Sequence, residues 1–256
     1  MHRRLALVRR PSPLLADGIV THVERAMRVD PGLALRQWQE YCDVLRRRGW
    51  QLQEVTPVDD CPDGVFVEDQ VVVHGDVAVL CRSGAPERRG ERPGVREAVE
   101  AHGYRVVEVT APGTLDGGDV LKHGRFAWVG TGGRTNAEGV RQLAAAFAHN
   151  RVEVVPVPVS RVLHLKSAVT ALPDGSVIGY PPLVDDPSVW DAFVPVPEEA
   201  GAHVVLLGGQ SVLMSAAAPR TAHLLEGRGL DVTVVDISEF EKLEGCVTCL
   251  SVRLRS

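Results

Sequence analysis

The chain has 256 residues, of which 45% are hydrophobic and 24% are charged, and its formal net charge is -5. This length suits one large domain or two small ones, with a core that needs no metal or crosslink. The negative charge argues against a nucleic-acid-binding protein, because a phosphate backbone attracts a basic surface. No run of about 18 apolar residues occurs in the sequence, so we expect no membrane-spanning segment.

Four segments carry the periodicity or the end signals of α-helices. In LALRQWQEYCDVLRRRGW, the apolar residues Leu35, Trp38 and Leu45 recur at helix spacing, and Gly49 follows as a stop. The other three segments begin or end at typical capping residues. They are GVREAVEAHG, NAEGVRQLAAAFAHN and PRTAHLLEGRG, at 94–103, 136–150 and 219–229.

Short β-rich runs with turn signals lie between these helices and predict four hairpins, at 71–80, 119–130, 170–180 and 203–215. After the second and the fourth hairpin come a helix and then another strand, at 151–157 and 231–237. This repeated unit of two hairpin strands, a helix and a strand indicates a repeat architecture rather than a doubly wound sheet.

The two ends of the chain predict how the repeats close. If the first strand, RLALVRR, pairs with the last, CVTCLSVRL, the units form a ring of about five. Cys249 would then lie at the centre of the molecule. No low-complexity linker or composition shift divides the chain, so we expect a single domain over residues 1–256.

The number of cysteines and the N-terminal residues indicate the cellular compartment of the protein. Five cysteines, an odd and scattered set, fit a reducing compartment better than a disulfide framework. The opening MHRRLALVRRPSP contains too short an apolar stretch for a signal peptide. We therefore expect a cytoplasmic protein.

The segment EGCVTCLSVRLRS carries a cysteine pair, Cys246 and Cys249. A C-x-x-C pair can be a redox pair or half of a zinc site, but the sequence has no second Cys or His pair with suitable spacing. Redox pairs of the thioredoxin type open a helix, whereas this segment is β-branched and predicts a strand. Residues three apart on a strand point to opposite faces, so we expect the two thiols not to meet. One of them could be a lone nucleophile, or both could be buried structural cysteines.

Two stretches place carboxylates at the start of apolar strands. DGVFVEDQVVV contains Asp63, Glu68 and Asp69, and APGTLDGGDVL contains Asp116 and Asp119. Either stretch alone could be an ordinary turn, because Asp-Gly is a common pair of turn residues. Together they indicate an acidic pocket lined by strand ends, which suits a planar cation such as a guanidinium.

Three basic side chains could complete such a pocket. His164 lies at the end of the apolar run in SRVLHLKSAV, where it is either a core residue or the partner that a nucleophilic thiol needs. Arg88 lies in PERRGE, and Arg134 follows two glycines just before an expected helix, a favourable place to hold an anion. Taken alone, each arginine is better explained as a surface charge. Carboxylates at one end and arginines at the other would fit a free arginine-like amino acid.

Five segments in chain order, FVED, LDGGDV, GRTNAEG, LHLKS and TCLSV, resemble the dimethylarginine dimethylaminohydrolases of the guanidino-modifying, amidinotransferase-like superfamily. The resemblance extends over nearly the whole chain. It implies an α/β fold, the five-bladed α/β propeller of ββαβ units called pentein, in agreement with the repeat pattern. It also implies hydrolysis of Nω-methylated L-arginine to L-citrulline and dimethylamine or methylamine, through a covalent thiouronium and without a metal or organic cofactor.

The resemblance assigns a role to each candidate residue. Cys249 would be the nucleophile, His164 the general acid and base, and Asp116 the carboxylate that orients the histidine. The substrate-binding residues would be Asp63 at the α-ammonium group, Glu68 and Asp69 at the guanidinium, Arg88 and Arg134 at the carboxylate, and Ile19 on a covering loop. Cys246 matches none of these roles and is expected to be structural.

The position of Lys166 bears on the choice of substrate. Arginine and agmatine deiminases of the superfamily carry an aspartate two residues after the histidine, where this chain has Lys166. A second carboxylate would disfavour methyl groups on the guanidinium, because it would be desolvated without a hydrogen bond in return. Its absence favours a methylated substrate over arginine.

Two alternatives remain. An arginine deiminase-type hydrolase would release ammonia from arginine or from another N-substituted arginine. A non-catalytic binding protein could use the same propeller, although the complete set of Cys249, His164 and Asp116 argues against it. We expect a small-molecule substrate, with neither nucleic acid nor a membrane as partner; paired edge strands would allow a homodimer.

Overall fold

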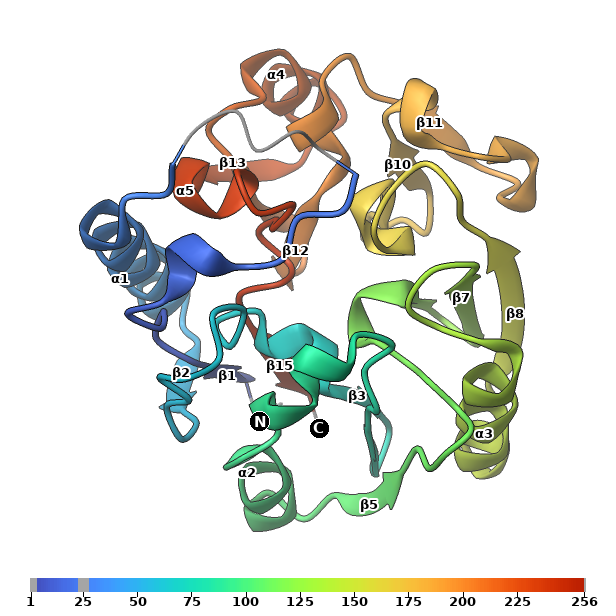
Figure 1. Ribbon diagram of the computed structural model, residues 1–256. Helices are drawn as coiled ribbons and strands as arrows, with labels where there is room; N and C mark the ends of the chain where they lie inside the picture. The colour runs from blue at the N-terminus through green and yellow to red at the C-terminus, as the bar shows by residue number, and fades with distance from the viewer. Residues whose placement is uncertain (1–3, 23–27, 256) are drawn as a thin grey trace.

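The computed structural model describes residues 4–22 and 28–255, which form five three-stranded sheets arranged as a ring (Figure 1). In every sheet the middle strand pairs antiparallel with one neighbour and parallel with the other. This shared pattern makes the sheets five copies of one unit. The predicted five-bladed α/β propeller is confirmed.

The blades follow one another along the chain. The first joins β15 (Val252–Arg255), β1 (Arg4–Val8) and β2 (Gln51–Glu54), and the second joins β3 (Val71–His74), β4 (Val77–Leu80) and β5 (Arg105–Glu108). The third and fourth are β6 (Val120–His123), β7 (Phe126–Thr131) and β8 (Glu153–Pro158), then β9 (Val169–Ala171), β10 (Val177–Gly179) and β11 (Phe193–Pro195). The fifth is β12 (Val204–Gly208), β13 (Ser211–Ser215) and β14 (Asp231–Val235). All four predicted hairpins are therefore present.

A helix connects the two parallel strands in four of the five blades. These helices are α1 (Pro31–Arg47), α2 (Val95–Ala101), α3 (Ala137–Phe147) and α4 (Pro219–Gly227). In the fourth blade the connection contains only the 3-10 turns Pro181–Leu183 and Pro187–Val189. A fifth helix, α5 (Ser238–Glu241), is a single turn that leads to the C-terminal segment. No helix within the described ranges is long and apolar enough to cross a membrane.

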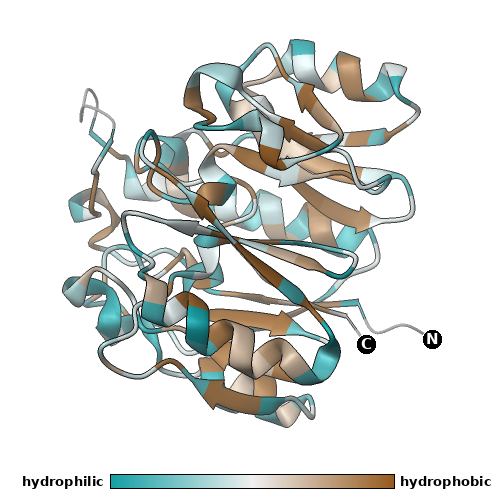
Figure 2. Cartoon of the chain, turned by 90° about the vertical axis from the view of Figure 1, so that its right-hand side faces the viewer, coloured by the Kyte–Doolittle hydropathy of each residue, from teal (hydrophilic) through white to brown (hydrophobic). Residues whose placement is uncertain are grey.

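Helix α1 shows why these elements form where the sequence predicts them. The side chain of Asp30 accepts hydrogen bonds from the first backbone N–H groups of the helix, and Pro31 occupies the first turn. Its apolar face buries Trp38, Tyr41 and Leu45. Figure 2 shows the same division throughout the chain, with apolar residues concentrated on the strands and polar residues on the loops and outer helix faces. Burial of these faces between neighbouring blades holds the ring together.

Pairing of the two chain ends closes the ring. Strand β1 runs antiparallel to β15, with Leu5 opposite Leu254 and Leu7 opposite Val252. The predicted closure is therefore confirmed, and it draws the segment just before β15 into the interior, where both Cys246 and Cys249 are buried.

The conformation of this C-terminal segment differs from the prediction. Residues 247–250 form a turn, and β15 begins only at Val252. The N–H of Cys249 donates to the carbonyl oxygen of Cys246 at 3.0 Å, and the hydroxyl of Tyr41 donates to the carbonyl oxygen of Val247 at 3.0 Å. The Sγ atoms of Cys246 and Cys249 consequently lie 3.2 Å apart. The prediction that the two thiols do not meet is wrong, because a hydrogen-bonded turn replaces the extended strand on which it depended.

Candidate active site

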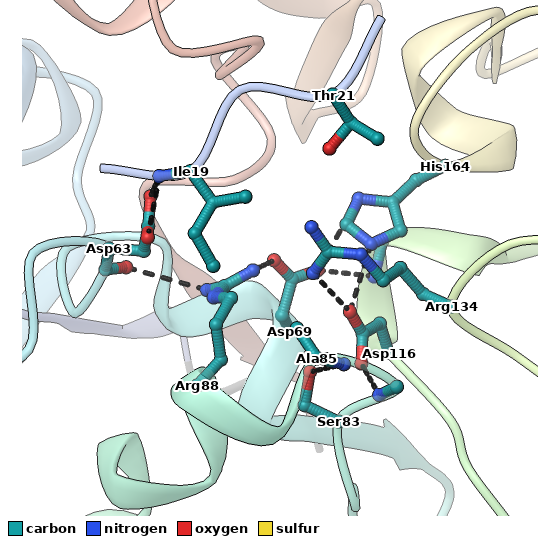
Figure 3. Close-up of polar contacts among 12 residues, drawn as sticks. Ile19, Thr21, Asp63, Asp69, Ser83, Ala85, Arg88, Asp116, Arg134 and His164 are labelled. Atoms are coloured by element: carbon teal, nitrogen blue, oxygen red, sulfur yellow. Dashed lines mark hydrogen bonds and ion pairs between the residues drawn. The ribbon is translucent and has the colours of Figure 1, made fainter. Parts of the chain in front are cut away.

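A small hollow near the centre of the ring collects most of the predicted site residues. Its lining includes the predicted residues Ile19, Asp63, Asp69, Arg88, Arg134, His164 and Cys249, with the apolar residues Phe66, Leu163 and Leu243 and the backbone around Gly245. Asp116 lies directly behind His164 and is fully buried. Figure 3 shows the side chains of Asp69, Arg88, Asp116, Arg134 and His164 pointing toward one another from separate segments of the chain.

The repeat explains why residues so distant in sequence meet here. Asp69, Asp116, His164 and Cys249 each lie a few residues before the first strand of a blade, namely β3, β6, β9 and β15. In Figure 1 the first strands β3, β12 and β15 lie near the centre of the ring, whereas β5, β8 and β11 lie at its rim. One position of the repeated unit, used in four blades, therefore supplies the chemistry of the hollow.

His164 is held between two carboxylates. Its Nε2 atom lies 3.1 Å from Oδ2 of Asp116, and its Nδ1 atom lies 3.9 Å from Oδ1 of Asp69. Burial by itself would lower the pKa of this imidazole, but the charge of Asp69 and the hydrogen bond to Asp116 outweigh it and raise the pKa of His164 to about 9. The side chain is therefore an imidazolium at neutral pH and can donate a proton.

Asp116 is fixed as the partner of that imidazolium. Its Oδ1 atom accepts a hydrogen bond from the backbone N–H of Gly84 at 3.1 Å. Burial would raise the pKa of this carboxyl, but the hydrogen bond from His164 and the charge of His164 hold it below its usual value. Asp116 thus stays ionised and keeps the imidazole in one orientation.

Gly118, the second glycine of LDGGDV, allows Asp69 and His164 to approach each other. The N–H of Gly118 donates to Oδ1 of Asp69 at 2.8 Å. A Cβ atom at position 118 would lie 2.7 Å from that oxygen and 2.7 Å from Nδ1 of His164, closer than side chains tolerate. Glycine is required at this point because the backbone itself forms the floor between the two side chains.

Arg88 forms a buried cluster with two carboxylates. Its NH1 atom lies 2.7 Å from Oδ2 of Asp69, and its Nε and NH2 atoms contact the carboxylate of Glu91 at 2.8 and 2.7 Å. Burial alone would raise the pKa of Asp69, but the charge of His164 and the charge and hydrogen bond of Arg88 outweigh it and lower the pKa. Glu91 was missed in the sequence, although its place three residues after Arg88 in PERRGE is the spacing of a helical ion pair.

Arg134 and Asp63 carry opposite charges and keep hydrogen-bonding capacity for a ligand in the hollow. Among the described residues, the buried NH1 atom of Arg134 has no hydrogen-bond partner and lies 3.6 Å from Oδ2 of Asp116. The carboxylate of Asp63 accepts the backbone N–H of Ile19 at 3.0 Å, which ties the predicted covering loop to the hollow. Burial raises the pKa of Asp63. An incoming ligand with both signs of charge could satisfy these two residues.

Glu68 is the predicted binding residue that the structure does not bring into the hollow. It lines a separate cavity of about 320 Å³ near the centre of the ring. There its Oε1 atom lies 2.6 Å from Nζ of Lys166 and 3.4 Å from NH2 of Arg253. Residues 67–70 form a 3-10 helix, so the neighbouring side chains of Glu68 and Asp69 point in different directions.

The two thiols of the C-terminal turn share one proton. The hydrogen bond from Cys249 lowers the pKa of Cys246 to about 5, and the same contact raises the pKa of Cys249. The backbone N–H of Cys246 points at Sγ of Cys249 at 3.4 Å. The pair therefore carries a single negative charge near neutral pH. Only Cys249 lines the hollow, so a cation bound there would attract that charge to its sulfur.

Five blades of one repeated unit around a cysteine, a histidine and ionised carboxylates define a protein of the guanidino-modifying class, and the profile of the arginine deiminase family matches residues 43–205. The N(G),N(G)-dimethylarginine dimethylaminohydrolase of Streptomyces coelicolor is 64% identical over 100% of this chain and 98% of that protein. The protein of the same name from Pseudomonas aeruginosa is 32% identical over 96% of this chain and 98% of its own length. The chain belongs to the dimethylarginine dimethylaminohydrolase family.

Solved structures agree with this assignment. A dimethylarginine dimethylaminohydrolase with a histidine replaced by glycine, in an adduct with S-methyl-L-thiocitrulline, superimposes with a TM-score of 0.92 at 31% identity, over 99% of this chain and 100% of that one. A cysteine-to-serine variant of the Pseudomonas aeruginosa enzyme with citrulline superimposes with a TM-score of 0.91 at 31% identity, over 98% and 99% of the two chains. The predicted family is confirmed.

Proposed function

We propose that this protein hydrolyses Nω-methylated L-arginine to L-citrulline and dimethylamine or methylamine, as a single catalytic domain over residues 1–256 in the cytoplasm. The observation that carries the proposal is the buried hollow in which Cys249, the imidazolium of His164 and ionised carboxylates face one space. The 64% identity over the full chain to a protein of that name supports it. These side chains and water suffice for the reaction.

Substrate binding follows from the charges around the hollow. The guanidinium would lie against the carboxylate of Asp69, beside the sulfur of Cys249. The NH1 group of Arg134, which has no hydrogen-bond partner among the described residues, would hold the α-carboxylate together with Arg88, and Asp63 would hold the α-ammonium group. Ile19, tied to Asp63 through its backbone N–H, would cover the bound amino acid. Because Glu68 faces the other cavity, we assign the guanidinium to Asp69 alone.

The central carbon of a guanidinium is a poor electrophile because its positive charge is delocalised. A covalent intermediate divides this difficult reaction into two easier steps. The bound cation draws the shared negative charge of the thiol pair to Cys249, whose thiolate attacks the central carbon. His164, protonated at neutral pH, donates its proton to the departing amine and leaves a thiouronium on Cys249. The neutral imidazole then removes a proton from water, which attacks the same carbon. Collapse of that adduct releases citrulline and restores the thiolate.

A substrate panel tests the proposed function. Purified protein receives asymmetric dimethylarginine, monomethylarginine or arginine, and citrulline and the released amine are quantified by chromatography. We expect citrulline with dimethylamine or methylamine from the two methylated substrates, because no second carboxylate at position 166 opposes the methyl groups and Lys166 is paired with Glu68. Ammonia released from arginine would instead support the deiminase alternative, and no turnover of any compound would support a binding protein.

Removal of the carboxylate-binding donor gives a second prediction. We expect Arg134→Ala to raise KM for methylarginine by about 10–100-fold, the effect of losing a charge-assisted hydrogen bond in a buried site. Steady-state kinetics of citrulline formation measure it. Arg141→Ala, which removes an arginine from the exposed face of α3, is the matched control and should leave KM unchanged. An unchanged KM in Arg134→Ala would show that this arginine does not hold the substrate.

A further inference from the structure

Cys246 is a buried thiol that the proposed reaction does not use. It does not line the hollow, yet its sulfur lies 3.2 Å from the sulfur of Cys249. The other described cysteines, Cys42, Cys61 and Cys81, are free thiols in other parts of the structure. The contact with Cys249 therefore raises the question of what a second thiol does beside a nucleophile.

The backbone of the turn already has the shape that a disulfide requires. The hydrogen bond from the N–H of Cys249 to the carbonyl oxygen of Cys246, at 3.0 Å, closes a four-residue turn. Such a turn holds its end Cα atoms within about 7 Å, and disulfides join Cα atoms about 4.4–6.8 Å apart. Tyr41 fixes the same turn through the carbonyl oxygen of Val247. Oxidation would thus need a small movement of the two sulfur atoms and none of the surrounding strands.

Donors around the pair favour a reactive thiolate. The hydroxyl of Thr248 lies 3.2 Å from Sγ of Cys246, and the backbone N–H of Cys246 points at Sγ of Cys249. A thiolate that faces an accessible cavity is the form that oxidants attack. Cys249 faces the hollow, so a small oxidant can reach it by the route that the substrate would take.

We propose that Cys246 and Cys249 form a reversible redox pair that a hydroperoxide converts to a disulfide. The two sulfur atoms share one proton, which can pass from Cys249 to Cys246 across their 3.2 Å contact. In that state the Cys249 thiolate attacks the O–O bond of the hydroperoxide and takes its terminal OH group as a sulfenic acid. The departing hydroxide or alkoxide takes a proton from the His164 imidazolium and leaves as water or an alcohol. The thiol of Cys246 attacks that sulfur, forms the S–S bond and releases a second water. One thiolate, one thiol, one hydroperoxide and one proton thus give one disulfide, one water and a second water or an alcohol, and a dithiol reductant reverses the step by exchange.

The pair has two consequences for the enzyme. The disulfide removes the thiolate that attacks the substrate, so turnover stops; this consequence rests on the proposed function, whereas disulfide formation does not. Capture of the sulfenic acid by Cys246 also prevents its further oxidation to sulfinic acid, which thiol reductants do not reverse. Cys246 therefore preserves the nucleophile under oxidising conditions.

The experiment compares wild type, Cys246→Ser and, as matched control, Cys61→Ser, which removes a cysteine outside the pair. Each protein is treated with hydrogen peroxide and then with dithiothreitol. Intact mass, non-reducing peptide mapping and citrulline formation are followed in parallel. In wild type and in Cys61→Ser we expect loss of two hydrogens, a linked peptide joining residues 246 and 249, full loss of turnover and its return with dithiothreitol. In Cys246→Ser we expect two added oxygens on Cys249, the mass of a sulfinic acid, and no return of turnover with dithiothreitol.

The mass readouts separate the two proposals. Added oxygen on Cys249 in the wild-type protein without a linked peptide would overturn the redox pair, as would full recovery of Cys246→Ser with dithiothreitol. A linked peptide without loss of turnover would leave the pair intact and overturn the role of Cys249 in the reaction. A saturating substrate present during oxidation should slow formation of the linked peptide, because it occupies the route to Cys249; an unchanged rate would contradict access through the hollow.

Discussion

Cys249→Ser is expected to abolish turnover of methylated arginine, with a loss of roughly 10⁴-fold or more, the scale seen when an enzyme loses its nucleophile. The physical reason lies in the charge of the neighbouring groups. His164 is an imidazolium at neutral pH and cannot remove a proton from a serine hydroxyl. A thiol pair that shares one proton already carries the negative charge that attack requires, whereas a serine does not ionise in this range. Initial rates of citrulline formation measure the loss.

Cys246→Ser is the control for this prediction. It removes the other thiol of the pair but keeps a hydroxyl that can donate to Sγ of Cys249, and it lies outside the hollow. The bound guanidinium and the imidazolium of His164 still favour the Cys249 thiolate, so most of the turnover should remain. Intact mass of acid-quenched wild-type enzyme should also show a covalent adduct that maps to Cys249. Equal losses in the two variants, or an adduct on Cys246, would identify the wrong sulfur as the nucleophile.

The architecture could be predicted from the sequence because it depends on a repeated local pattern. Turn signals within the hairpins at 71–80 and 119–130 and the cap at Asn136 act over a few residues, and each produced the element expected. The pairing of RLALVRR with the C-terminal strand could be predicted because these two end strands together complete the fifth of the repeated units. The meeting of Asp69, His164 and Cys249 then follows from the ring, because the residues that precede inner strands lie at its centre.

Side-chain directions near the hollow could not be predicted in the same way. Val247 and Thr248 are β-branched and favour a strand, yet Tyr41, two hundred residues earlier in the chain, holds this segment in a turn and brings Cys246 to Cys249. Contacts with distant residues also determine the direction of the Glu68 side chain. Lys166 and Arg253 attract it from other blades into the second cavity, and neither contact has a local signal in FVED. Tertiary contacts determine both outcomes.

The second large effect is expected when the proton donor His164 is replaced. We expect His164→Gln to lower kcat by about 10²–10⁴-fold, the usual contribution of a general acid and base, while KM changes little. The imidazole must be protonated to act as the acid, and the carboxylates of Asp69 and Asp116 raise its pKa to about 9. The wild-type rate should therefore fall as the pH rises through about 9.

Asp116→Asn tests whether the fall of the rate at alkaline pH is caused by deprotonation of His164. Asparagine keeps the shape of the side chain but removes the negative charge beside Nε2, so the pKa of the imidazole falls and the alkaline limb of kcat/KM moves to lower pH. Asp174→Asn, which removes a carboxylate from an exposed turn, should leave the limb in place. If Asp116→Asn reduces the rate equally at every pH without moving the limb, the group that titrates is not the histidine, and the proton donor must be sought elsewhere in the hollow.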